Sequence, residues 1–99
     1  MIRGTTPTLE FIIPFDTSIL DEAWVTLSQN GSVILNKQLG DCQCEERKLT
    51  VRLTQEETLK LDCDCKTEIQ IRARTKEGEA LASNIITVNT DRILKDGVI

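Results

Sequence analysis

Apolar and polar residues alternate with a period of two along much of the chain. In the segments 9–15, 48–54 and 68–74, every second residue is apolar, and most of the residues between them are polar or charged. Because successive side chains of a strand point to opposite faces, this pattern predicts half-buried β-strands. Pro14 has no amide hydrogen to donate to a neighbouring strand, so the first strand should lie at a sheet edge or end there.

Two short motifs predict how the chain reverses and how it crosses between sheets. Asn30-Gly31 separates two apolar segments, and both residue types accept the positive φ of a tight type I′ hairpin. Thr54 and Glu57 form a capping-box pair, in which each side chain can accept the backbone amide of the other residue. We therefore expect one short helical turn that crosses from one sheet to the other.

These patterns together predict an all-β fold, an immunoglobulin-like antiparallel β-sandwich of six or seven strands with one short helical crossover turn. We expect residues 1–90 to form a single β-sandwich domain and residues 91–99 to form a C-terminal tail. Trp24 stands between Ala23 and Val25, and neighbours in a regular strand cannot share a face. Either a bulge brings Trp24 into the core, or its side chain faces solvent or a partner.

Composition narrows the functions that such a domain can perform. The chain has 99 residues and no histidine, so imidazole-dependent catalysis and histidine metal ligands are excluded. Its net charge is −4, and Phe11, Phe15 and Trp24 are its only aromatic residues, which argues against nucleic-acid binding. No apolar run reaches the roughly 20 residues that span a bilayer, and the first seven residues hold no hydrophobic signal core. We expect no enzyme, and no nucleic acid or membrane as a partner.

Three stretches of sequence carry a resemblance to known proteins. They are MIRGTTPT at 1–8 with PFDT at 14–17, LTQEETL at 53–59, and GEALASNII at 78–86 with Val88. With these stretches the chain resembles small proteins encoded in the structural-gene region of prophages from Gram-positive anaerobes. The strand–turn–strand half is also similar to the N-terminal β-sandwich of phage baseplate upper proteins. The resemblance implies a structural or assembly role in the virion, without enzymatic activity, and it transfers no catalytic or binding residue.

The cysteines form the one constellation with candidate chemistry, the two C-x-C pairs Cys42/Cys44 and Cys63/Cys65. Residues two apart in a strand share a face, so two such segments lying side by side would bring four sulfurs together. Three interpretations stay open: buried cysteines that pack as small hydrophobic residues, a structural zinc site of four thiolates, and disulfide bonds. Acidic neighbours favour a divalent cation, whereas C-x-C is shorter than the usual zinc spacing and a reducing compartment disfavours disulfides. No other cofactor is expected.

A row of cations is the remaining candidate surface. Arg72, Arg74 and Lys76 alternate along one predicted strand face, and together with Lys48 and Arg52 they would form a basic patch. Such a row is typical of the solvated face of a sheet, and a patch of one sign also suits an acidic protein partner.

These observations predict a non-enzymatic structural or assembly protein of a phage or prophage, associated with the tail or baseplate. It would act by protein–protein contact with other virion proteins or by self-association. We expect it in the cytoplasm of the bacterial host during assembly and then in the virion. The alternative is a small bacterial cytoplasmic adaptor or regulatory module that is stabilised by a structural four-cysteine zinc site.

Overall fold

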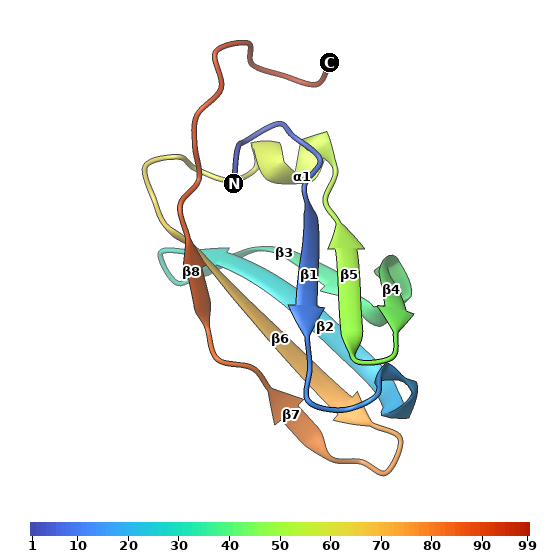
Figure 1. Ribbon diagram of the computed structural model, residues 1–99. Coiled ribbons are helices and arrows are strands. Elements are labelled where there is room, and N and C mark those ends of the chain that lie inside the picture. The colour runs from blue at the N-terminus through green and yellow to red at the C-terminus, as the bar shows by residue number, and fades with distance from the viewer.

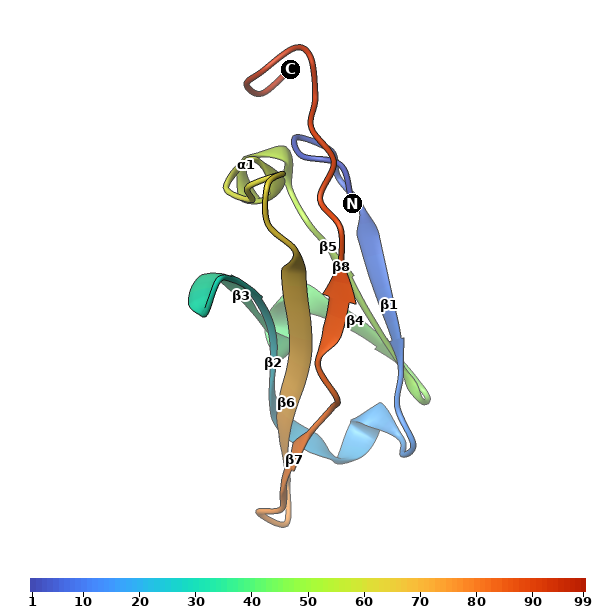
Figure 2. The same cartoon turned by 90° about the vertical axis from the view of Figure 1, so that its left-hand side faces the viewer.

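The computed structural model describes residues 1–99 as two antiparallel β-sheets that form a sandwich (Figures 1 and 2). One sheet has the strand order β1-β5-β4, and the other has the order β3-β2-β6-β7, with β8 also paired to β6. No helix in the structure is long and apolar enough to cross a bilayer. The predicted all-β sandwich is confirmed. The strands are β1 (Thr8–Ile12), β2 (Leu20–Gln29), β3 (Ser32–Gln38), β4 (Cys42–Glu45), β5 (Lys48–Arg52), β6 (Thr67–Thr75), β7 (Ala80–Ala82) and β8 (Ile86–Val88), and the helical segments are η1 (Thr17–Ile19), η2 (Leu39–Asp41) and α1 (Gln55–Leu59).

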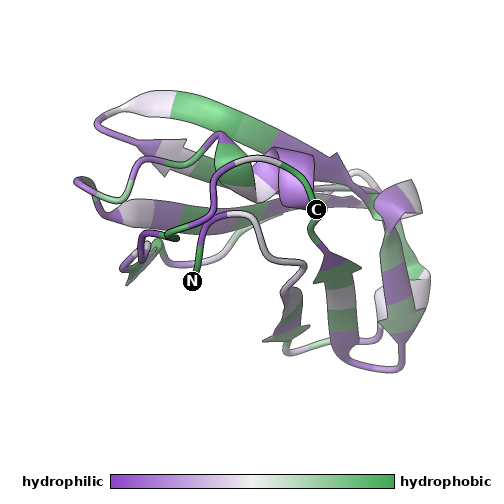
Figure 3. Cartoon of the chain, turned by 90° about the horizontal axis from the view of Figure 1, so that it is seen from above, coloured by the Kyte–Doolittle hydropathy of each residue, from purple (hydrophilic) through white to green (hydrophobic).

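The core lies between the two sheets, where the inward side chains of the strands meet. Val25 and Leu27 of β2 and Leu49 and Val51 of β5 are each at most 1% exposed. Alternate residues of these strands face outward, and hydrophobic and hydrophilic bands alternate along the ribbons (Figure 3). The period-two pattern therefore predicted the buried face correctly. The buried apolar cluster consists of Leu20, Ala23, Val25, Leu27, Leu35, Leu49, Val51, Leu53, Leu61, Ile69, Ile71 and Ala73.

The hairpin between β2 and β3 turns at Asn30-Gly31, as predicted. The φ angles of these two residues are 50° and 78°, and Gln29 pairs with Ser32 on either side of them. Positive φ at both central positions is the conformation of a type I′ turn, whose twist matches that of the flanking strands. The turn therefore helps to set the register of the hairpin.

The predicted capped turn is α1, which carries the chain from β5 in one sheet to β6 in the other (Figure 1). Thr54 Oγ1 accepts the Glu57 amide at 3.1 Å, and Glu57 Oε1 accepts the Thr54 amide at 2.9 Å. The second carboxylate oxygen, Glu57 Oε2, lies 2.7 Å from Lys37 Nζ. Lys37 pairs with the buried Val25 and has a side chain only 14% exposed, so it points inward from the edge strand β3. An inward charge of this kind discourages pairing with another sheet edge.

We expect Glu57 to make the stability of the fold sensitive to acid. Burial raises the pKa of Glu57, but the hydrogen bonds from Lys37 and from the Thr54 amide outweigh it and hold the pKa below the usual 4.5. A carboxylate with a lowered pKa stabilises the folded state above its unfolded pKa, and this contribution is lost as the pH falls through the folded value. Between about pH 6 and about pH 3, Glu57→Gln should therefore lose less unfolding free energy than the unmodified chain.

Urea unfolding at the two pH values measures this difference, and glutamine keeps an oxygen that can accept the Thr54 amide. Glu56→Gln is the matched control, because Glu56 is an exposed neighbour that makes no ion pair. It should leave the loss in acid unchanged. Equal losses for Glu57→Gln and the unmodified chain would show that the Lys37–Glu57 pair does not couple stability to pH.

The predicted return strand over residues 80–90 is split into β7 and β8 at Ser83. The Ser83 amide donates to the Ile71 carbonyl at 2.8 Å, while Ser83 Oγ accepts the Ile71 amide at 3.0 Å. A side-chain oxygen thus takes the position of a backbone carbonyl, and regular pairing with β6 resumes only at Ile86. This split and the formation of β4 by the first C-x-C segment raise the number of strands to eight, against the predicted six or seven.

The two ends of the chain lie together beside α1. β1 is an edge strand that ends before Pro14, as predicted. Residues 91–99 form no helix or strand, and they continue past the sandwich (Figure 2). Ile93 is half-buried against Gly4 near the start of the chain, whereas the side chain of Leu94 is 93% exposed. The segment after residue 90 is attached at both ends, because Ile99 also exchanges two hydrogen bonds with the Gln55 side chain of α1, at 2.8 and 3.1 Å.

Candidate functional site

Trp24 lies on the outer face of the five-stranded sheet and not in the core. Its neighbours Ala23 and Val25 are 1% and 0% exposed, and the β2–β6 pairing runs without a shift from Glu22 to Ser28. Because no bulge interrupts this pairing, regular alternation turns the indole outward. Of the two placements that the sequence allowed, the one outside the core is correct.

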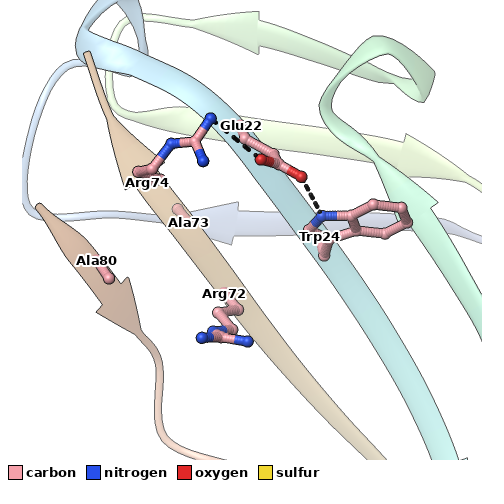
Figure 4. A pocket seen from close by; sticks show the side chains of 6 residues that line it. All are labelled: Glu22, Trp24, Arg72, Ala73, Arg74 and Ala80. Carbon is pink, nitrogen blue, oxygen red and sulfur yellow. Dashed lines mark hydrogen bonds and ion pairs between the residues drawn. The ribbon is translucent and has the colours of Figure 1, made fainter. Parts of the chain in front are cut away.

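Glu22 holds the Trp24 indole in place, because it stands two residues earlier on the same face. Trp24 Nε1 donates to Glu22 Oε1 at 2.8 Å (Figure 4). Arg74 Nη2 lies 3.2 Å from the other oxygen, Glu22 Oε2, and 2.8 Å from Asp21 Oδ2. The hydrogen bond to Asp21, together with the charges of Glu22 and Asp21, raises the pKa of Arg74 above its usual value. Both carboxylate oxygens of Glu22 are therefore occupied.

Arg72 differs from Arg74 because it has no acidic partner. In the sheet register it pairs with Trp24 on β2 and with Ala82 on β7. Its side chain is exposed and forms no ion pair with any residue of the chain. Figure 4 shows its guanidinium on the β7 side of β6, away from the Glu22 carboxylate. The full donor set of this guanidinium is available to a molecule outside the chain.

These side chains surround a shallow hollow of about 210 Å³ on the sheet face. On the side of β7 the neighbours of the two arginines are alanines, because Ala80 pairs with Arg74 and Ala82 pairs with Arg72. No long side chain of these two β7 residues covers that side of the hollow. The hollow presents a fixed aromatic ring and an unpaired guanidinium, a combination suited to binding by contact. The residues that line it are Glu22, Trp24, Arg72, Ala73, Arg74 and Ala80.

A second hollow, of about 180 Å³, opens between the sheets near the end of β1. Eight of its ten lining residues are hydrophobic, among them Phe15, Leu20 and Leu81. Its one hydroxyl, on Ser83, is already bonded to the Ile71 amide. Binding sites generally combine an apolar wall with a few polar groups that orient the ligand. The outer sheet face has such groups, and we therefore take it as the candidate site.

The four cysteines predicted as zinc ligands are not brought together. Cys42 and Cys44 lie on β4, whereas Cys63 and Cys65 lie in the loop between α1 and β6. The loop is held against the β2–β3 turn, where Asn30 Nδ2 donates to Cys65 Sγ at 3.0 Å. In Figure 1 this loop and β4 lie on opposite sides of the molecule. All four cysteines are free thiols in the structure.

The two C-x-C segments stay apart because β4 pairs only with β5 while the second segment belongs to a loop of the other sheet. The one group of three potential ligands with atoms within 4.8 Å of one another is Asp62, Cys63 and Asp64, all exposed. It contains a single thiol, which is not the four-thiolate set of a structural zinc site. The structure therefore does not assemble the four-cysteine site of the alternative function, which stays a prediction.

Cys42 behaves as the packed cysteine of the three interpretations. It packs against the hydrophobic core from the inner side of β4, whereas Cys44 is exposed. Burial, together with the nearby Cys44 and Asp41, raises the pKa of the Cys42 thiol to about 11, and Lys37 opposes this shift only in part. Because the thiolate is the nucleophile, Cys42 should be a poor one in the folded protein.

We expect Cys42 to be alkylated by iodoacetamide at about pH 8.5 at least roughly tenfold more slowly in the folded chain than in concentrated guanidinium, because the smaller thiolate fraction outweighs the higher nucleophilicity of a thiolate with a raised pKa. Peptide mass spectrometry measures each cysteine separately, and the exposed Cys44 is the internal control. A folded rate within about twofold of the denatured rate would contradict the raised pKa. Joint protection of all four thiols, relieved by a chelator, would instead indicate the four-cysteine metal site.

The predicted basic patch is smaller than the sequence suggested. Arg72 and Arg74 share the outer face of β6, but Lys48 and Arg52 belong to β5 in the other sheet. Since two carboxylates engage Arg74, Arg72 is the free cation of the hollow. Sequence reasoning also missed the role of Glu22, although the spacing Glu22-x-Trp24 in a predicted strand already places both side chains on one face.

Comparisons with protein-family models, with curated proteins and with solved structures give no match for this chain. Its function is therefore argued from the outer sheet face and from the sequence.

Proposed function

We propose that this chain is a non-enzymatic protein-binding module that serves as a structural or assembly component of a phage or prophage particle, associated with the tail or baseplate. The observation that carries the proposal is the half-buried Trp24, fixed by Glu22 beside the unpaired Arg72 on the outer sheet face. Tryptophan and arginine are enriched among the residues that dominate protein–protein binding energies. The outer sheet face presents Trp24 and Arg72 to a partner without any change of fold.

The particle setting is supported by the resemblance of residues 1–8, 53–59 and 78–86 to small prophage proteins. Contact by a rigid sheet face suits a subunit that takes a fixed place in an assembly, because its backbone need not rearrange on binding. The partners would be other virion proteins or a second copy of the chain. The protein would be made in the host cytoplasm and remain in the completed particle.

Photo-cross-linking from the proposed face tests this function in cells that produce the particle. Ala82→p-benzoylphenylalanine places a reactive group beside Arg72 without occupying the lining of the hollow. Thr50→p-benzoylphenylalanine, on the outer face of the other sheet, is the matched control. We expect position 82 to cross-link to a protein that copurifies with particles, and position 50 to give little product. Absence of the chain from purified particles, or no protein cross-link from position 82, would refute the proposal.

A further inference from the structure

We propose that the hollow on the outer sheet face binds an acidic segment of the partner protein, with a partner carboxylate on Arg72 and an apolar part of the segment against Trp24. This inference rests on the proposed function and specifies the chemistry of the partner. It follows from the hydrogen-bonding groups that the hollow leaves unfilled.

The acidic groups of the hollow are already satisfied within the chain. Glu22 Oε1 accepts the indole N–H of Trp24 at 2.8 Å, and Glu22 Oε2 lies 3.2 Å from Arg74. Asp21, just outside the hollow, is paired with the same guanidinium at 2.8 Å. The hollow therefore has no free carboxylate, and a basic partner would have to compete with these internal contacts.

The basic groups of the hollow are not all satisfied. Arg74 is shared by two carboxylates, but Arg72 has no acceptor within the chain. Glu68 is the one acidic residue of β6, and it stands four residues from Arg72, which is about 13 Å along an extended strand. A guanidinium forms its strongest contacts with carboxylates, often through two parallel hydrogen bonds. Charge complementarity therefore selects an acidic partner.

The apolar half of the hollow supplies the second contact. The hydrogen bond to Glu22 restricts the rotation of the Trp24 ring, so little conformational entropy is lost when a partner covers it. Ala80 and Ala82 leave the approach to Arg72 open from the side of β7. Water excluded by the apolar contact would strengthen the ion pair beside it, as neighbouring contacts do around interface hot spots.

The experiment compares arginine variants in the chain that carries the photo-reactive residue at position 82. Arg72→Glu should lower the yield of the protein cross-link at least about tenfold. Arg72→Lys should give an intermediate yield, because lysine keeps the positive charge but lacks the planar set of guanidinium donors. Arg52→Glu makes the same charge change on the other sheet and should leave the yield within about twofold. Arg72 is exposed and forms no ion pair, so thermal unfolding of the two Arg72 variants should match that of the parent chain.

Mapping the cross-linked peptide gives an independent readout, and we expect aspartate or glutamate next to the residue captured. A protein cross-link whose yield is unchanged in Arg72→Glu, or whose captured segment has no acidic residue, would overturn this inference and leave the proposed function standing. No protein cross-link from position 82 in the parent chain would overturn both.

Discussion

Replacing Gln29 by alanine should lower the free energy of unfolding by about 2–3 kcal/mol, the typical sum for three hydrogen bonds with partly buried partners. Gln29 ends the inward row of β2 and is 5% exposed. Its Nε2 donates to the Asp62 carbonyl at 2.8 Å and to Thr67 Oγ1 at 3.1 Å, and its Oε1 accepts the Asp62 amide at 2.8 Å. One side chain thus joins the β2–β3 hairpin to the loop that precedes β6.

The variant leaves the Asp62 amide and carbonyl without their Gln29 partner, whereas Thr67 Oγ1 keeps its contact with Thr90 Oγ1 at 2.8 Å. No buried side-chain nitrogen or oxygen of the folded chain lacks a partner. Urea unfolding and thermal unfolding measure the loss, which corresponds to a melting temperature lower by roughly 10–20 °C for a domain of this size. Gln70→Ala is the matched control, because Gln70 makes one exposed hydrogen bond, to the Ser83 carbonyl. If both variants lose the same free energy, the Gln29 network is not an important stabilising contact.

Gln29 also illustrates what local sequence patterns can and cannot predict. Alternation, the Asn30-Gly31 turn and the Thr54/Glu57 cap each depend on residues a few positions apart, and each formed as predicted. The same alternation places Gln29 on the inner face, but its partner Asp62 is 33 residues away. No local rule identifies such a partner, because it depends on how the sheets and loops pack.

In the candidate site, too, some features follow from local sequence patterns and others depend on how the whole chain folds. The outward position of Trp24 was predicted as one of two alternatives, and alternation decides between them because neither register shift of β2 falls at Trp24. That Arg74 is paired and Arg72 is not depends on Asp21 and Glu22 reaching one arginine across the sheet. Whether two cysteine segments meet is likewise decided by strand order, which placed one of them on an edge strand of the three-stranded sheet. Strand order is a property of the whole chain and not of either motif.

Gly4→Ala should destabilise the fold by about 1–3 kcal/mol, mainly through backbone strain and in smaller part through a steric overlap with side-chain methyl groups. Gly4 has a φ of +73°, in the region that L-residues with a Cβ avoid. A Cβ at this position would lie 2.9 Å from Ile93 Cδ1 and 3.3 Å from Leu59 Cδ2. The new methyl group would therefore displace the Ile93 Cδ1 methyl, which packs the start of the C-terminal segment beside Gly4.

Gly78→Ala separates the two effects, because Gly78 has a φ of +93° but no atom within 4 Å of the added Cβ. It should lose only the strain, about 1–2 kcal/mol. The overlap can be relieved independently with Ile93→Val, which deletes Cδ1 and should make Gly4→Ala less costly in the double variant than in the single one. Urea unfolding of the four chains gives this coupling directly. Two results together would contradict this contact: equal losses of unfolding free energy for Gly4→Ala and Gly78→Ala, and a loss for Gly4→Ala that Ile93→Val does not reduce. Ile93 would then not pack on Gly4 in solution, and the C-terminal segment would be attached elsewhere.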